Sequence, residues 1–116
     1  MANTIDKNSY DRAILHLDTN DGEITLAELR SGSDEAALTG ARIVEIFYYV
    51  GASGTLEIDR GGTQAIKLTA QSGGPLIGNI NYRQAGVALR GSDSADIGVT
   101  VSGTDTLATL VVHKTH

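Results

Sequence analysis

The residues of this chain that could do chemistry are three histidines and fourteen acids, without any cysteine. His16 has no partner at metal-ligand spacing. His113 and His116 are three positions apart in a segment that alternates like a strand, where such residues point to opposite faces. Serine, histidine and aspartate all occur, but the Gly-x-Ser-x-Gly nucleophile elbow does not. We therefore predict no metal site, no cofactor and no enzyme activity.

One acidic segment, residues 18–23, resembles a calcium-binding loop in composition, because carboxylates and an amide lie close to a glycine. An EF-hand loop places its glycine sixth and a bidentate glutamate twelfth. In this chain the glycine is fifth after the start at Asp18, and the twelfth residue is Leu29. We interpret the segment as a turn, and its Asp-Gly pair predicts a hairpin.

Some of the other carboxylates occur in pairs, which could suggest a glycosidase, because such enzymes use two acids across the scissile bond. Asp34 with Glu35 and Glu57 with Asp59 are predicted to lie on exposed turns or at strand edges, where solvated charge is the ordinary explanation. The acidic loop at residues 93–96 is interpreted in the same way. The sequence thus gives binding more support than catalysis.

The overall composition limits the choice of fold and partner. A chain of 116 residues fits one domain, which we place at residues 10–116 after an N-terminal arm at residues 1–9. The net charge of -5 is the wrong sign for holding phosphate backbones, so no nucleic-acid partner is expected. No apolar run is long enough for a membrane or signal segment, so we expect no membrane partner and a protein made in and released into the cytoplasm, unless it leaves as part of something larger.

The segment at residues 42–50 is the best-defined strand in the sequence, and it holds three of the five aromatic residues, Phe47, Tyr48 and Tyr49. Regular alternation would place Phe47 and Tyr49 on one face and Tyr48 and Val50 on the other. Both faces are then largely apolar, which is typical of a strand inside a sandwich that is covered from two sides, or from one side and by a neighbour.

Short alternating runs and glycine-rich turns continue along the chain, since 14 of the residues are glycine. Further strands are expected at residues 10–17, 23–29, 55–59, 64–70, 79–83, 86–90, 97–101 and 106–114. The strands at 42–50, 55–59 and 64–70 are expected to form a meander, and one helical turn could occur near residues 33–38. The pattern predicts an all-β fold, a two-sheet antiparallel β-sandwich of jelly-roll or Ig-like type with eight to nine short strands.

Two of the predicted strands, at residues 97–101 and 106–112, have no interrupting charge or proline. An edge strand of that kind aggregates unless something covers it. We therefore expect one of them to be paired with, or shielded by, another subunit. A carbohydrate-binding sandwich would need exposed aromatic residues, but tryptophan is absent and the tyrosines fall within strand patterns.

The order of these motifs resembles small structural proteins of tailed bacteriophage virions. The resemblance spans roughly residues 38–114. It is carried by the segments at residues 39–50, 54–59, 97–103 and 107–114, together with the Met-Ala-Asn-Thr-Ile-Asp start. It rests on strand pattern and turn placement, and residues 6–32 do not take part in it.

The resemblance implies a non-enzymatic decoration, or cement, protein on the outer surface of the capsid of the virion. Such a protein binds the major capsid protein and stabilises the shell, as a homo-oligomer for which a trimer at local threefold positions is one form. Candidate contacts with the capsid or a second subunit are Ile5 and Tyr10 in the arm and Leu76 and Ile77 in a loop at residues 71–78. The alternative is a carbohydrate-binding or tail-fibre module that contacts the host surface.

Overall fold

The computed structural model describes residues 4–6, 11–18, 23–30, 35–82 and 96–116, which form eight strands and one short 3-10 helix. The strands are β1 (Thr4–Asp6), β2 (Arg12–Leu17), β3 (Gly40–Val50), β4 (Thr55–Arg60), β5 (Thr63–Thr69), β6 (Leu76–Asn81), β7 (Ile97–Ser102) and β8 (Leu107–Thr115). The 3-10 helix, η1 (Ala27–Leu29), lies between β2 and β3.

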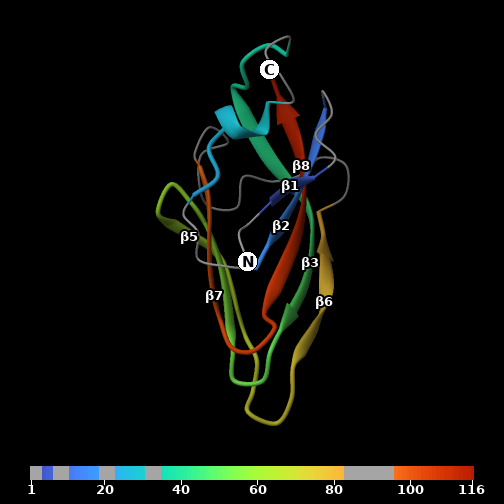
Figure 1. Ribbon diagram of the computed structural model, residues 1–116, viewed down its shortest axis with the longest axis vertical. Helices are drawn as coiled ribbons and strands as arrows, with labels where there is room; N and C mark the ends of the chain where they lie inside the picture. Colours follow the sequence, from blue (N-terminus) through green and yellow to red (C-terminus); the bar gives the residue numbers. More distant parts are fainter. Residues whose placement is uncertain (1–3, 7–10, 19–22, 31–34, 83–95) are drawn as a thin grey trace.

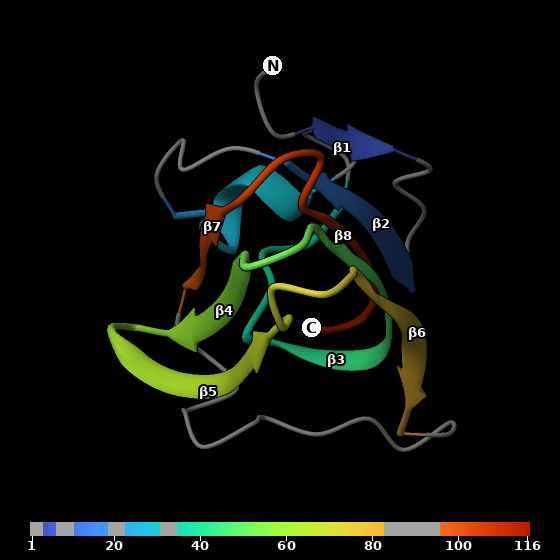
Figure 2. The same cartoon turned by 90° about the horizontal axis from the view of Figure 1, so that it is seen from below.

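The strands form two antiparallel sheets that face each other (Figures 1 and 2). The larger sheet has five strands in the order β1-β2-β8-β3-β6, and the smaller has three in the order β5-β4-β7. The predicted two-sheet β-sandwich is confirmed, and eight strands agree with the expected number.

The core lies between the two sheets and is almost entirely aliphatic. Alternate residues of β2, Ala13, Leu15 and Leu17, are buried, as the alternation in the sequence predicted. Each fully buried Val, Leu or Ile side chain favours folding by about 1.5–3 kcal/mol. The other buried apolar side chains are Ile24, Leu29, Leu38, Ala41, Ile43, Val44, Ile46, Val50, Leu56, Ile58, Ala70, Ile97, Val99, Ala108, Leu110 and Val112.

Strand β8 lies inside the larger sheet, between β2 and β3, with backbone partners on both sides. The prediction that residues 106–112 form an unprotected edge is therefore wrong. A long apolar strand is also what the interior of a sheet requires, and sequence alone does not separate the two cases. Strand β7, the other candidate, is at the end of the three-stranded sheet, where Ile24 adds one bridge to Ile97.

The regular alternation predicted for β3 is broken by a register shift between Ile43 and Glu45. A bulge of this kind adds one residue and reverses the facing of the residues beyond it. Ile43 is consequently buried together with Ile46 and Val50, although an unbroken strand would separate them. The outer face of β3 is not covered, since Phe47 is 45% exposed. Of the two expected arrangements, the structure has the strand covered on one face with neighbouring strands beside it, and not the strand covered on both faces.

The predicted strand at residues 23–29 is replaced by one bridge at Ile24 followed by η1. The Thr25 hydroxyl accepts a hydrogen bond from the Glu28 amide at 3.3 Å, and the Glu28 carboxylate accepts one from the Thr25 amide at 3.0 Å. These reciprocal bonds follow the pattern of a capping box, which favours a helical turn. The turn directs Leu29 into the core.

The predicted meander is also wrong, because β3 and β4 belong to different sheets and only β4 and β5 form a hairpin. Leu76 and Ile77, expected in a loop, begin β6. The predicted strand at residues 86–90, the middle of the predicted turn at residues 18–23 and most of the acidic loop at residues 93–96 cannot be compared, because residues 19–22 and 83–95 are outside the described part of the chain. Of the possible helical turn near residues 33–38, residues 35–38 are described, and they are not helical.

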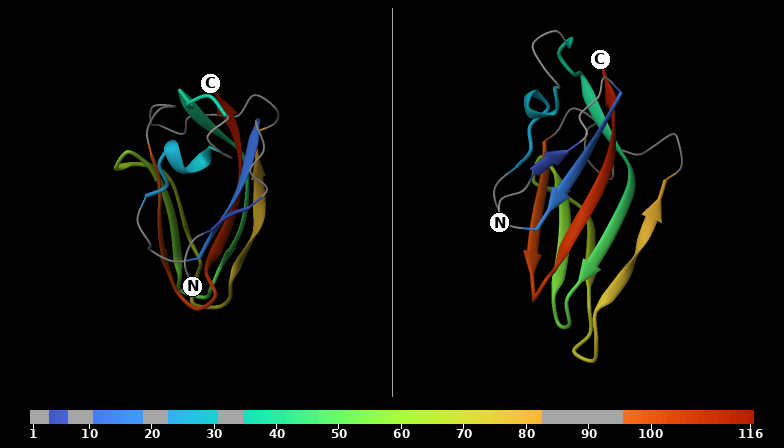
Figure 3. Two further views of the ribbon diagram at one scale, coloured as in Figure 1. Left: turned by 45° about the horizontal axis from the view of Figure 1, so that its top comes forward. Right: turned by 45° about the vertical axis from the view of Figure 1, so that its right-hand side comes forward.

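The two sheets are joined at one end by the turns that follow β3 and β7 (Figure 3). The Thr106 hydroxyl accepts a hydrogen bond from the Gly51 amide at 3.0 Å and donates one to the Ser102 carbonyl at 2.7 Å. Gly51 has no room for a side chain, because a Cβ there would lie 2.0 Å from the Thr104 carbonyl oxygen. This close packing fixes the separation of the sheets at that end.

Candidate functional site

The outer face of the five-stranded sheet carries an apolar patch that we define as Phe47, Tyr49, Ile77 and Leu107. Tyr49 pairs in register with Ile77 on one side and with Leu107 on the other, and Phe47 is the next outward residue of β3. Ile77 is 65% exposed and Leu107 is 42% exposed. Exposed apolar patches of a few hundred Å² on a monomer are often functional, so this patch is a candidate binding surface.

Next to the patch, the same face carries several polar side chains. Asn79 and Thr109 are the register neighbours of Phe47 on β6 and β8. The Asn79 amide donates a hydrogen bond to the Glu45 carboxylate at 2.9 Å, and His16 lies 3.3 Å from the Thr109 hydroxyl. These side chains therefore contact one another across the strands.

The far end of this face carries a basic row that we define as Arg12, His113 and Arg42. His113 of β8 pairs in register with Arg12 of β2 and with Arg42 of β3. Adjacent strands are about 4.8 Å apart, so the row extends about 10 Å across the sheet. Both arginines are exposed, whereas the other described arginines, Arg30 and Arg60, are partly and fully buried.

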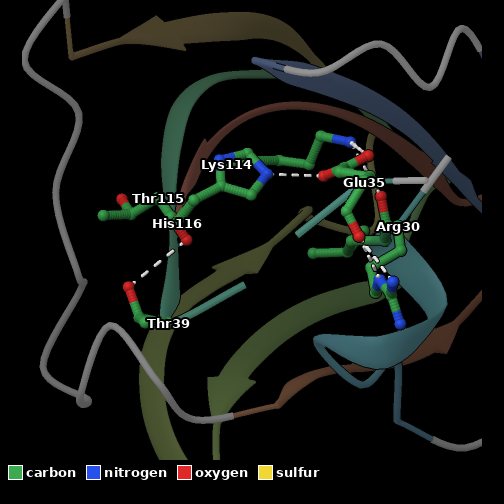
Figure 4. Close-up of polar contacts among 7 residues, drawn as sticks. Arg30, Glu35, Thr39, Lys114, Thr115 and His116 are labelled. Carbon is green, nitrogen blue, oxygen red and sulfur yellow. Dashed lines mark hydrogen bonds and ion pairs between the residues drawn. The ribbon is translucent and has the colours of Figure 1, made fainter. Parts of the chain in front are cut away.

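A second polar cluster is buried at the end of the sandwich near η1 (Figure 4). The Glu35 carboxylate lies 2.9 Å from the Lys114 ammonium and 2.6 Å from Nε2 of His116. Lys114 also donates a hydrogen bond to the Leu29 carbonyl at 2.9 Å. The side chains of Lys114 and Glu35 are 0% and 2% exposed, so this ion pair is almost completely removed from water.

Backbone contacts extend this cluster to its neighbours. The Arg30 guanidinium donates to the Glu35 carbonyl through Nε at 3.0 Å and also through its terminal nitrogen. The Thr39 amide donates to the Thr115 carbonyl at 2.8 Å. The contacts fasten the segment before β3 to the end of β8, and we interpret the cluster as structural.

The prediction that Glu35 is a solvated carboxylate is wrong, because the side chain is buried against Lys114. The sequence did contain a signal. In β8 the even positions from Ala108 to Val112 are apolar and buried, and Lys114 continues that series. A lysine at a core-facing position requires a buried carboxylate partner.

The predicted contact residues have different environments. Ile5 of β1 and Leu76 of β6 are partly buried and pack against the core, whereas Ile77 is highly exposed. Tyr10 lies outside the described residues. Their role in an interface stays a prediction. The outer-face residues Phe47, Leu107 and the basic row were not predicted as contacts, although outward alternation along β2 and β8 could have indicated part of the set.

Two open depressions accompany these features. One of about 420 Å³ is formed by the loop between β5 and β6, and its lining residues, 69–71 and 73–76, have no titratable side chain. The other, of about 280 Å³, is lined in part by Asp18 and Asp105. Within the described ranges, no group of three or more histidine or acidic side chains is arranged to hold a metal ion. No helix in that part of the chain is long and apolar enough to span a membrane.

Comparison with known proteins gives no family assignment. No protein-family model, no curated protein and no solved structure matches this chain significantly.

Proposed function

We propose that this chain is a non-enzymatic structural protein of a tailed-phage virion, a decoration protein that binds the outer surface of the major capsid protein shell and stabilises it. The observation that supports this proposal is the exposed apolar patch on a rigid sheet face. Ile77, one of the contact residues expected from the sequence, is its most exposed member at 65%.

The physical argument is that a protein of this kind acts through surface complementarity. A stable interface between two proteins buries roughly 800 Å² per partner. Contacts of modest size are sufficient on a shell, because many identical sites are available and an oligomer can occupy several of them together. Binding at such sites would link neighbouring capsid subunits without any reacting group.

The test uses capsid shells of the encoding phage prepared without this protein. The purified chain is mixed with the shells, and occupancy is measured by sedimentation together with cryo-electron microscopy. We expect saturable, stoichiometric occupancy and a higher temperature of shell disruption. If folded protein leaves the shells undecorated at saturating concentration, the proposal is wrong.

A second candidate is a carbohydrate-binding module that contacts the host surface. One observation favours it, since exposed Phe47 is flanked in register by Asn79 and Thr109, and sugars stack on aromatic rings while polar groups bind their hydroxyls. A glycan array and a host-cell adsorption assay test it. Binding that is lost in Phe47→Ala would support this function in place of the first.

A further inference from the structure

The outer face of the five-stranded sheet has opposite chemical characters at its two ends. The apolar patch (Phe47, Tyr49, Ile77 and Leu107) is at one end and the basic row (Arg12, His113 and Arg42) is at the other. Six positions of β8 separate Leu107 from His113, which corresponds to about 20 Å of strand. The face is therefore long enough for one partner to contact both ends.

We propose that this face is the docking surface for the major capsid protein, and that the partner segment presents apolar side chains to the patch and carboxylates to the basic row. This inference rests on the proposed function. It adds the face that binds, the chemistry of the partner and the direction in which the partner lies.

Charge complementarity identifies the acidic part of the partner. The chain as a whole carries a net charge of -5, yet both exposed arginines of its described part lie in this one row with His113 between them. A guanidinium has five donors and binds carboxylates through two parallel hydrogen bonds, so each arginine can add an acidic partner to its existing contacts. The row thus selects a negatively charged surface.

A second copy of the same chain fits this face less well. If two copies met face to face about a two-fold axis parallel to the strands, the two basic rows would oppose each other. If the axis were perpendicular to the strands, each basic row would cover the apolar patch of the other copy. Neither arrangement places acidic side chains opposite the basic row, and like charges in contact oppose association.

The apolar patch contributes affinity and the basic row contributes specificity and encounter rate. Burying the exposed parts of Ile77, Phe47 and Leu107 removes apolar surface from water. Exposed charge pairs act mainly on the association rate, and salt screens them. Binding should therefore weaken with salt while the contribution of the patch remains.

The experiment measures the affinity for undecorated capsid shells of the wild type, two double variants and one single variant. Ile77→Ser/Leu107→Ser alters the patch, and Arg12→Glu/Arg42→Glu alters the row. Lys67→Glu is the matched control, because Lys67 is an exposed cation on the smaller sheet. We expect each outer-face variant to lower the affinity at least about tenfold and the control to leave it unchanged. Only the arginine variant should lose the salt dependence.

Circular dichroism and thermal unfolding verify that each variant is folded. If a double variant fails to fold, the single variants Ile77→Lys and Arg42→Glu replace it, since both side chains are exposed. Wild-type binding that all folded outer-face variants retain overturns the docking face and leaves the proposed function intact. A wild type that does not bind the shells overturns both. Oligosaccharide binding that depends on Phe47 but not on the arginines also overturns the inference.

Discussion

Replacing Lys114 by methionine should destabilise the fold strongly, because it removes one partner of a buried ion pair. Lys114 is 0% exposed and its ammonium contacts both the Glu35 carboxylate and the Leu29 carbonyl at 2.9 Å. In the variant, the Glu35 carboxylate stays buried at 2% exposure and loses its contact with Lys114, while its contact with His116 remains. Breaking a buried pair in this way costs about 3–5 kcal/mol. For a domain of this size the melting temperature should fall by about 12–20 °C.

The measurement is equilibrium urea unfolding followed by circular dichroism, with Lys67→Met as the control for loss of an exposed lysine. The control should change the free energy of unfolding by less than about 0.5 kcal/mol. Glu35→Met combined with Lys114→Met should recover much of the loss, since apolar residues often replace a buried pair without cost. If Lys114→Met costs no more than the control, the ion pair contributes nothing and our interpretation of the cluster fails.

Three further predictions concern other parts of the molecule. Thr106→Val should lower the free energy of unfolding by about 1–3 kcal/mol in urea titrations, because the Gly51 amide and the Ser102 carbonyl both lose their hydrogen bond to the Thr106 hydroxyl. Thr106→Ser keeps a hydroxyl and should retain most of the stability. Burial raises the pKa of Tyr82 above its usual 10.0. The neutral phenol therefore contributes stability below pH 10, and this contribution is lost as the pH rises through the raised pKa. Ultraviolet titration should show that Tyr82 ionises at a higher pH than a free tyrosine, and Tyr82→Phe should remove this part of the pH dependence of stability. Ile77→Ser should change thermal stability little, because the side chain is 65% exposed, and a large loss would show that Ile77 supports the core.

The fold class was predictable from the sequence because alternation and glycine turns are local signals. In β2 the buried residues Ala13, Leu15 and Leu17 follow the pattern directly. The sheet order was not predictable, because a run such as β8 looks the same at an edge and in the interior. The bulge between Ile43 and Glu45 likewise follows from no local pattern of the sequence, and it changes which side chains of β3 face the core.

The candidate site was predictable only in part, for the same reason. Ile77 was singled out, but its neighbours Tyr49 and Leu107 come from strands that are distant in sequence and meet only through the register of the sheet. Glu35 was assigned to solvent because its acidic neighbourhood resembles a loop. Its burial depends on Lys114, which is 79 positions away.

The interior position of β8 has a consequence for how the chain reaches its native state. His16 and Thr109 meet across 93 positions of sequence, so the larger sheet cannot form until the ribosome has released the residues of β8. Until then β2 and β3 present unpaired backbone edges to other nascent chains. Domains built on such distant pairings fold slowly, on the order of milliseconds to seconds. Deleting residues of β8 should therefore reduce the yield of soluble protein more than substituting any exposed side chain does.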